Sequence, residues 1–260
     1  MDRIGLVGLI LVAYLNPERS RANCTFVFRD IHLHFAIYRR TMITQDFVDF
    51  FNGLEENNHK DWFHAHKNDY DTHVRGPFIA LVDELIPQII TELEAFISPN
   101  AKDALFRINR DIRFTPDRPP YNTIMKASFA PGGKRSFLPG YYLGIDAHSV
   151  HVGGGLFNLK SPELKKIREH IADDPMRFAE ILSDREFASR FGELKGERSK
   201  RLPREFKIFQ ERVPEIANKQ FFAMVELPLA DYLGKEGLDE VVMGYFRAVH
   251  PLNRFLKESF

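Results

Sequence analysis

The order of the predicted elements indicates an α+β fold with a mostly antiparallel sheet packed with N-terminal and C-terminal helices. Three observations support this prediction. Apolar residues recur at helical spacing up to residue 97, they alternate with period two from Leu105 onward, and helical spacing returns at Ser161. No strand alternates with helices in the βαβ manner, which argues against a doubly wound nucleotide-binding fold.

Three helices are expected in the first helical part. The first begins after an N-cap at Thr44 and ends at Asn57-Asn58. The second spans residues 62–75 and stops at the Arg75-Gly76 step. The third has Pro77 in its first turn, where proline is tolerated, and Pro87 in its interior, where a kink is expected.

The predicted strands are Leu105 to Phe114, Asn122 to Phe129, Tyr141 to Ile145, Val150 to Leu156 and, near the C-terminus, Phe221 to Leu227. Residues 146–149 form a short hairpin connection. Helices begin at Ser161, which is followed by a proline and an acid, and again at Asp174-Pro175. A last helix runs from Leu238 to Val249 and is interrupted by Pro251.

The composition is that of an ordinary globular protein without a charge bias. Hydrophobic residues make up 44% and charged residues 28% of the chain, and the 36 Lys and Arg balance the 36 Asp and Glu. A protein that coats nucleic acid or an anionic membrane shows a basic excess, so any anion recognition must be local. The single cysteine, Cys24, excludes an intrachain disulfide and a thiolate metal site, which fits a cytoplasmic location.

Residues 1–41 differ from the rest of the chain. The apolar run from Gly5 to Leu15 is far shorter than the roughly 20 residues that span a bilayer. It has the length of a signal-peptide core, but no net positive charge precedes it, so secretion is the minority interpretation. We expect residues 1–41 to be an N-terminal extension outside the fold and residues 42–260 to form a single α+β domain.

The segment from Arg107 to Phe114 is the most informative part of the sequence. If it is a regular strand, Arg110 lies in an apolar row with Ile108, while Arg107 and Arg113 lie on the opposite face. A buried Arg110 then needs a carboxylate, backbone carbonyls or a ligand pocket, and Glu226 is one candidate partner. A bulge at Asn109-Arg110 is the alternative that would bring the arginines onto one face.

Three prolines stiffen the following turn, residues 115–121, and hold Arg118 and Tyr121 near the strand. Arginine side chains suit phosphate or carboxylate because two parallel N–H donors match two oxygens. The alternative is that these charges form cross-strand ion pairs on a solvated sheet face.

With these residues the chain resembles a family catalogued as domain of unknown function 2461. The family's R-x-x-R-D-x-R-F run, followed by an acid, a basic residue and a tyrosine, maps onto Arg107, Arg110, Asp111, Arg113, Phe114, Asp117, Arg118 and Tyr121. Arg118 stands where lysine is expected. The resemblance also takes in Asn57-Asn58, Trp62-Phe63, Lys67, Tyr70, the Gly140 to Leu156 hairpin and the Leu164 to Ile171 helix. It implies no activity, but it favours a binding role for the arginine run.

Two other motifs are weaker. His66, Asp69 and His73 share a helical face and are a legitimate iron or zinc ligand set. A hydrophilic helix face that is rich in histidine is the favoured interpretation, and no metal or other cofactor is predicted. The segment Gly154 to Ser161 resembles a phosphate-binding P-loop, but Leu159 occupies the second glycine position.

Three functions remain open from the sequence. The first is a domain that binds a small ligand or anion, with these candidate residues: Arg107, Arg110, Asp111, Arg113, Asp117, Arg118, Tyr121, Lys67 and Tyr70. The second is an enzyme acting on phosphorylated or carboxylated substrates, with Asp111 or His151 as the proton carrier. The third is a protein or nucleic-acid interaction module using the basic segment Lys195 to Arg212. A small anionic ligand is the expected partner, and neither nucleic acid nor a membrane is expected.

Overall fold

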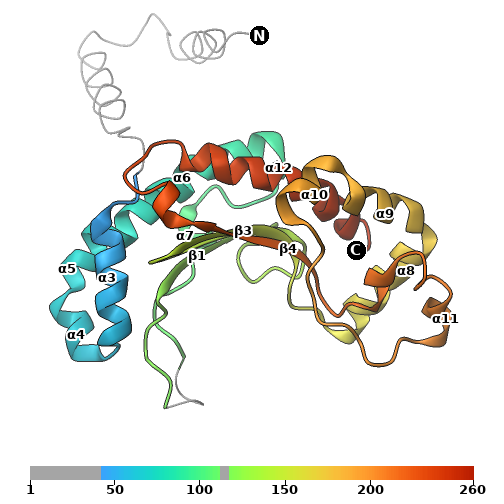
Figure 1. The fold of residues 1–260 in the computed structure, drawn as a ribbon, viewed down its shortest axis with the longest axis horizontal. Coiled ribbons are helices and arrows are strands. Elements are labelled where there is room, and N and C mark those ends of the chain that lie inside the picture. Colours follow the sequence, from blue (N-terminus) through green and yellow to red (C-terminus); the bar gives the residue numbers. More distant parts are fainter. Residues whose placement is uncertain (1–41, 112–116) are drawn as a thin grey trace, which may run out of the picture. The chain divides into compact units, whose positions relative to one another are not determined.

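The computed structural model describes residues 42–111 and 117–260, which form an α+β fold (Figure 1). Its α-helices are α3 Gln45–Glu56, α4 Lys60–Ala65, α5 Lys67–Asp69, α6 Gly76–Glu92, α7 Ala101–Ala104, α8 Ser161–Asp173, α9 Pro175–Ser183, α10 Arg185–Phe191, α11 Arg204–Lys207 and α12 Leu238–Lys257. Its strands are β1 Ile124–Phe129, β2 Gly140–Asp146, β3 Ser149–Leu156 and β4 Phe221–Pro228. A π-helix spans Tyr70–Arg75, and 3-10 turns span Pro214–Ala217 and Leu229–Asp231.

The four strands form one antiparallel sheet in the order β1-β2-β3-β4. Since side chains alternate across a strand, the register places one set of residues on each face. One face carries the buried apolar side chains of the sheet: Met125, Ala127, Phe129, Tyr141, Leu143, Ile145, Val150, Val152, Leu156, Phe221 and Ala223. The predicted antiparallel sheet is therefore confirmed, together with its hairpin at residues 146–149.

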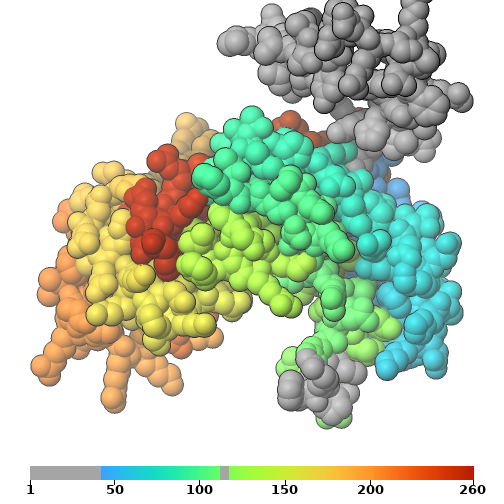
Figure 2. Space-filling model, turned by 180° about the vertical axis from the view of Figure 1, so that it is seen from behind, coloured from blue at the N-terminus to red at the C-terminus, as the bar shows by residue number. Residues whose placement is uncertain are grey.

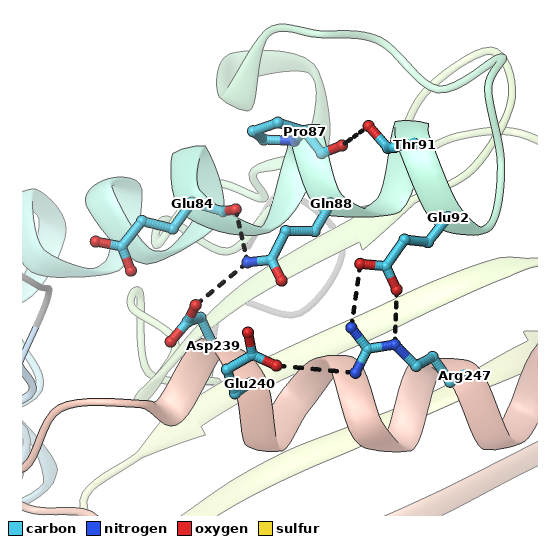
Figure 3. A network of polar contacts seen from close by, with 8 residues as sticks. All are labelled: Glu84, Pro87, Gln88, Thr91, Glu92, Asp239, Glu240 and Arg247. Carbon is cyan, nitrogen blue, oxygen red and sulfur yellow. Dashed lines mark hydrogen bonds and ion pairs between the residues drawn. The ribbon is translucent and has the colours of Figure 1, made fainter. Parts of the chain in front are cut away.

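Helices α6 and α12 cover this apolar face and lie side by side (Figures 1 and 3). Arg247 on α12 binds the Glu92 carboxylate of α6 through two hydrogen bonds, of 2.7 Å from Nε and 3.1 Å from Nη2. The Gln88 side chain adds a 3.2 Å hydrogen bond to Asp239. These contacts fix the register of the two helices above the sheet, while the apolar side chains beneath them supply most of the stabilisation.

Three consecutive glycines let neighbouring elements approach β3 closely. A β-carbon on Gly153 would lie 2.1 Å from the carbonyl oxygen of Ala223 in β4, and one on Gly154 would lie 2.8 Å from Val249 of α12. Gly155 has φ +123°, a conformation that other residues rarely adopt. The glycine run is therefore needed by the packing of β4 and α12 against β3.

The N-terminal helices form an aromatic cluster at one end of the sheet. Phe50 of α3 makes tilted or edge contacts with Trp62, Phe63 and Tyr70 at ring-centroid distances of 5.5, 6.2 and 5.7 Å. Aromatic pairs in such orientations add to the stabilisation from burial alone. This cluster holds the π-helix and α4 together, and it supports the segment described below.

Three local predictions were wrong. The second helix does not stop at Arg75-Gly76, because the π-helix passes directly into α6 at Gly76. Helix α12 is not interrupted by Pro251, and it runs to Lys257 because buried residues beyond the proline, including Leu252 and Phe255, keep packing on the core. The segment Leu105 to Phe114 is not a regular strand in its described part, residues 105–111, where the only pairing is through bridges to Ala127 and Tyr121.

Among residues 42–111 and 117–260, no helix is both long enough and apolar enough to cross a membrane. The predicted N-terminal extension, residues 1–41, lies outside the described residues, as does residue 113 of the arginine run.

We expect Gly153→Ala to destabilise the protein strongly. The new β-carbon would clash with backbone atoms of β4, which cannot move aside as a side chain can, so β3 and β4 must shift. We expect this to lower the free energy of unfolding by at least about 2 kcal/mol. Gly244→Ala is the matched control, because its β-carbon meets only the end of the Arg190 side chain, at 3.3 Å, and helix propensity favours alanine. Urea unfolding of both variants measures the difference; similar stabilities would contradict the proposed packing.

Candidate functional site

The arginine segment, residues 105–111, is held against the start of β1 by a few backbone hydrogen bonds. The Phe106 N–H donates to Lys126 O at 2.9 Å, the Asn122 N–H to Ile108 O at 2.7 Å, and the Arg110 N–H to Pro120 O at 2.8 Å. These bonds are too irregularly spaced to form a ladder, but they fix the path of the segment.

The side chain of Asn122 explains why this segment is not a regular strand. Its Nδ2 donates to the carbonyl oxygen of Ile108 at 2.9 Å and to that of Arg107 at 3.5 Å. Side-chain amides that bind nearby carbonyls in this way compete with sheet hydrogen bonding. The amide of Asn122 therefore adds a local clamp to the backbone hydrogen bond that its own N–H makes with Ile108 O.

Arg110 does not face the core, and that prediction was wrong. The residue is exposed, since the alternation of a regular strand does not apply to an irregular segment. Its Nε donates to Asn122 Oδ1 at 3.1 Å. Glu226, the predicted partner, lies instead beside His151, with a 3.7 Å distance between its Oε1 and the histidine Nδ1. The proposed bulge is not needed either, because Ile108 is buried while Arg107 and Arg110 are both exposed.

A second asparagine ties the turn before β1 to the N-terminal helices. Asn58 Nδ2 donates to Tyr121 O, and the Tyr121 N–H donates to Asn58 Oδ1, both at 3.1 Å. The buried Tyr121 ring stacks on Phe63 with a 4.1 Å centroid distance and an angle of 15°. Figure 2 shows the segment, in green, beside the cyan α4 and α5. Tyr121 therefore positions the segment.

A cleft of about 1110 Å³ opens beside the segment, and we call it the cationic cleft. Its described lining residues are Phe106, Arg107, Asn109, Arg110, Asp111, Arg118, Asn122, Lys126, Lys134 and Arg135. Among these, six side chains are cationic and one is a carboxylate. The predicted site residues Arg107, Arg110, Asp111 and Arg118 are thus brought together, and the cleft carries a strong local positive charge in a chain of zero net charge.

Three of these cationic residues were not predicted from the sequence: Lys126, Lys134 and Arg135. Lys126 lies in β1 and faces away from the helices, and Lys134 and Arg135 follow the Gly132-Gly133 turn, in which both glycines have φ +84°. Burial, and next the charge of Arg110, lower the pKa of Lys126. The period-two alternation of β1 could have placed Lys126 on the uncovered face, but its proximity to the arginine segment depends on tertiary structure.

The cleft adjoins the face of the sheet that lies opposite α12, and Lys126 belongs to both. The register aligns Lys126, Gly144, His151 and Glu226 in one row across β1 to β4. A β-carbon on Gly144 would lie 3.0 Å from the Tyr142 hydroxyl, so this hydroxyl lies over the glycine, between the positions of Lys126 and His151. Burial, and next the charge of Asp146, raise the pKa of Tyr142 to about 12.

His151 is oriented by Asp146 at the edge of this face. Its Nε2 lies 2.7 Å from Asp146 Oδ2, and Asp146 Oδ1 accepts the N–H groups of His148 and Ser149 at 2.8 Å each. Burial by itself raises the pKa of Asp146, but these hydrogen bonds outweigh it and hold the pKa below its usual range. The imidazole is therefore fixed by an ionised carboxylate, whose own position is fixed by the hairpin.

Other predicted site residues lie apart from the cationic cleft. Lys67 pairs with Asp71, and its Nζ lies 5.4 Å from the centroid of the Tyr70 ring. Tyr70 is buried, its hydroxyl donates to Met125 Sδ at 3.8 Å, and burial raises its pKa to about 12. Asp117 is exposed on the turn. None of these side chains lines the cationic cleft.

The weaker motifs gain no support. In the part of the chain that the structure describes, no group of three His, Cys, Asp or Glu side chains could hold a metal ion. The His66 Nδ1 contacts the Trp62 carbonyl oxygen at 2.9 Å. Gly154 and Gly155 lie inside the antiparallel strand β3 and not in a P-loop turn.

We expect Asp146→Asn to lower stability at neutral pH and to matter less in acid. Because the folded pKa of Asp146 is lowered, its contribution is complete above the ordinary aspartate value of about 3.9 and is lost as pH falls through the lower folded value. Urea unfolding should give a difference of about 1 kcal/mol at pH 7 that shrinks below pH ~4. The exposed Asp117→Asn is the control, and a difference independent of pH would contradict this assignment.

Comparison with known proteins identifies the family of this chain. The comparison with curated proteins gives no match. The model of the family described as "Conserved hypothetical protein (DUF2461)" matches residues 46–255, which include the sheet, the arginine segment and both helices above the sheet. The predicted resemblance is thereby confirmed: the chain belongs to the DUF2461 family.

Proposed function

We propose that this protein binds an oxyanion, a phosphate or a carboxylate, in the cationic cleft. The observation that carries the proposal is the charge of the cleft: six cationic side chains and one carboxylate line it among the described residues. Six cations collected at one place repel one another, and a bound anion relieves that repulsion. The zero net charge of the chain makes this a local property, so the proposal concerns a small ligand.

The orientation of Arg110 supports the proposal. Its contact with Asn122 engages Nε alone, and a guanidinium has five N–H donors. The amide of Asn122 thus restrains the arginine through one of these donors, and the other four take no part in this contact. A restrained arginine loses less side-chain entropy when it binds an oxyanion.

Lys126 supports the proposal from the other wall of the cleft. Its side chain is half-buried, and burial and Arg110 both disfavour its charged form. An oxyanion between Arg110 and Lys126 would reverse this effect, and the interaction is strengthened by the partial exclusion of water.

The proposal predicts that inorganic phosphate binds and that the double variant Arg110→Gln, Lys126→Gln weakens binding about tenfold or more. A charge-assisted hydrogen bond contributes about 1.5–3 kcal/mol, and 1.4 kcal/mol is a factor of ten. Isothermal titration calorimetry at low and high salt measures the effect, with affinity falling as salt rises.

Arg185→Gln is the matched control for this titration, because it removes one exposed cation at the start of α10, outside the cleft. We expect it to bind phosphate like the wild type. No detectable binding by the wild type, or the same loss in the control as in the double variant, would refute the proposal.

Catalysis is a second candidate function, favoured by the position of His151. It lines a pocket that shares Phe106, Lys126 and Lys134 with the cationic cleft. If Nε2–H donates its hydrogen bond to Asp146, the other ring nitrogen, Nδ1, is the one that could accept a proton from a substrate or water. The acid-base reaction would be hydrolysis of a phosphoester whose phosphate lies in the cleft.

If the protein is such an enzyme, His151→Gln should lower kcat for phosphoester hydrolysis by about 100-fold or more, the usual range for a general base. Asp146→Asn should lower kcat less and change its pH profile, because it acts by orienting the histidine. Asp111→Asn tests the alternative proton carrier. Hydrolysis that none of these three substitutions affects, or no hydrolysis of any phosphoester by wild type, would exclude this function.

A further inference from the structure

The cationic cleft continues into a second hollow of different chemistry, which we call the sheet pocket. The two share Phe106, Lys126 and Lys134 among the described residues, so they adjoin one another. The sheet pocket has a volume of about 510 Å³, within the range of small-molecule sites. Beyond Lys126 its walls are largely apolar, and they include Tyr142, Phe157, Phe222 and Met224.

Two glycines of the uncovered sheet face, Gly140 and Gly155, line the sheet pocket. The register of β2 and β3 places Gly140, Gly144, Gly153 and Gly155 on this face. Gly153 and Gly155 are required by the close approach of β4, as their β-carbons would lie 2.1 Å and 2.3 Å from backbone oxygens there. At Gly155 the wall of the pocket therefore has no side chain for a structural reason, and larger side chains such as Tyr142 and Met224 surround it.

Two aromatic side chains form the far wall of the sheet pocket. Phe157 is 60% exposed, and its ring centroid lies 4.8 Å from that of Phe222 at an angle of 57°. A large apolar side chain that is this exposed is unfavourable in water, and it is suited to stacking on a planar ligand. The exposed Phe157 and the half-buried Phe222 thus offer a binding surface in the sheet pocket, away from the arginine segment.

We propose that the ligand is amphiphilic: an oxyanion group, held in the cationic cleft, joined to a planar apolar body that packs on Phe157 and Phe222. This rests on the proposed anion binding and adds the chemical class of the rest of the ligand. Charge complementarity determines how the ligand is oriented. Its anionic group lies beside Lys126 and Lys134, and its apolar body lies over Tyr142. Nucleotides and simple aryl phosphates share this chemistry.

The proposal is tested by calorimetric titration with four probes: inorganic phosphate, adenosine 5′-monophosphate, 1-naphthyl phosphate and adenosine. We expect at least one of the two organic phosphates to bind about tenfold or more tightly than inorganic phosphate, since stacking on an aromatic side chain commonly contributes that much. Tighter binding of the nucleotide alone identifies a nucleotide ligand, and tighter binding of the naphthyl compound alone or of both identifies a general aryl anion. Adenosine should bind far more weakly than its phosphate.

Variants separate this inference from anion binding itself. Phe157→Ala, at a position that is 60% exposed, should weaken binding of the organic phosphates about tenfold and leave binding of inorganic phosphate unchanged. Phe222→Ala, after circular dichroism has established its fold, should act in the same direction. Lys126→Gln should weaken all three anions. Phe96→Ala is the control, because Phe96 is 76% exposed and lies outside the hollow.

Inorganic phosphate that binds as tightly as both organic phosphates would overturn the amphiphilic ligand and leave anion binding intact. The same holds if neither phenylalanine variant changes the affinity for the organic phosphates. If no anion binds at all, the proposed function fails, and this inference fails with it.

Discussion

The close approach of α12 and β4 to the glycines of β3 is the constraint on which the rest of the molecule depends. Gly154 lets α12 pack onto one face of the sheet, and Gly153 and Gly155 let the backbone of β4 lie against β3. Helices cover one face, and on the other face four positions of β2 and β3 are glycines that carry no side chain: Gly140, Gly144, Gly153 and Gly155. The polar side chains of Lys126, Tyr142 and His151 lie on this second face and line the sheet pocket.

The arginine segment depends on this arrangement but is not part of the sheet. Asn122 clamps its carbonyl groups and orients Arg110, and Asn58 fixes the turn that returns the chain to β1. Both asparagines use side-chain amides where a sheet would use backbone groups. The contacts with β1 and with the aromatic cluster therefore position the cationic side chains of the arginine segment. These side chains and Lys126, on the uncovered sheet face, line the same cleft.

Local patterns in the sequence were sufficient for the fold class and for most elements. The alternation of β1 to β4 and the hairpin at Asp146 were visible because they involve neighbouring residues. The irregular path of residues 105–111 was not, because the Asn58–Tyr121 contact joins residues 63 positions apart. Arg107 and Arg110 were predicted as site residues because they lie in one local motif. Lys134 was not predicted, because it comes to the cleft from another loop.

The most direct test of the central claim is the position of a bound anion in a crystal structure of the protein grown with phosphate. The account predicts density for the anion within hydrogen-bonding distance of the Arg110 guanidinium and Lys126 Nζ, with Asn122 still bonded to Arg110 Nε. Phosphate bound elsewhere, with the cleft cations turned onto protein carboxylates, would contradict it.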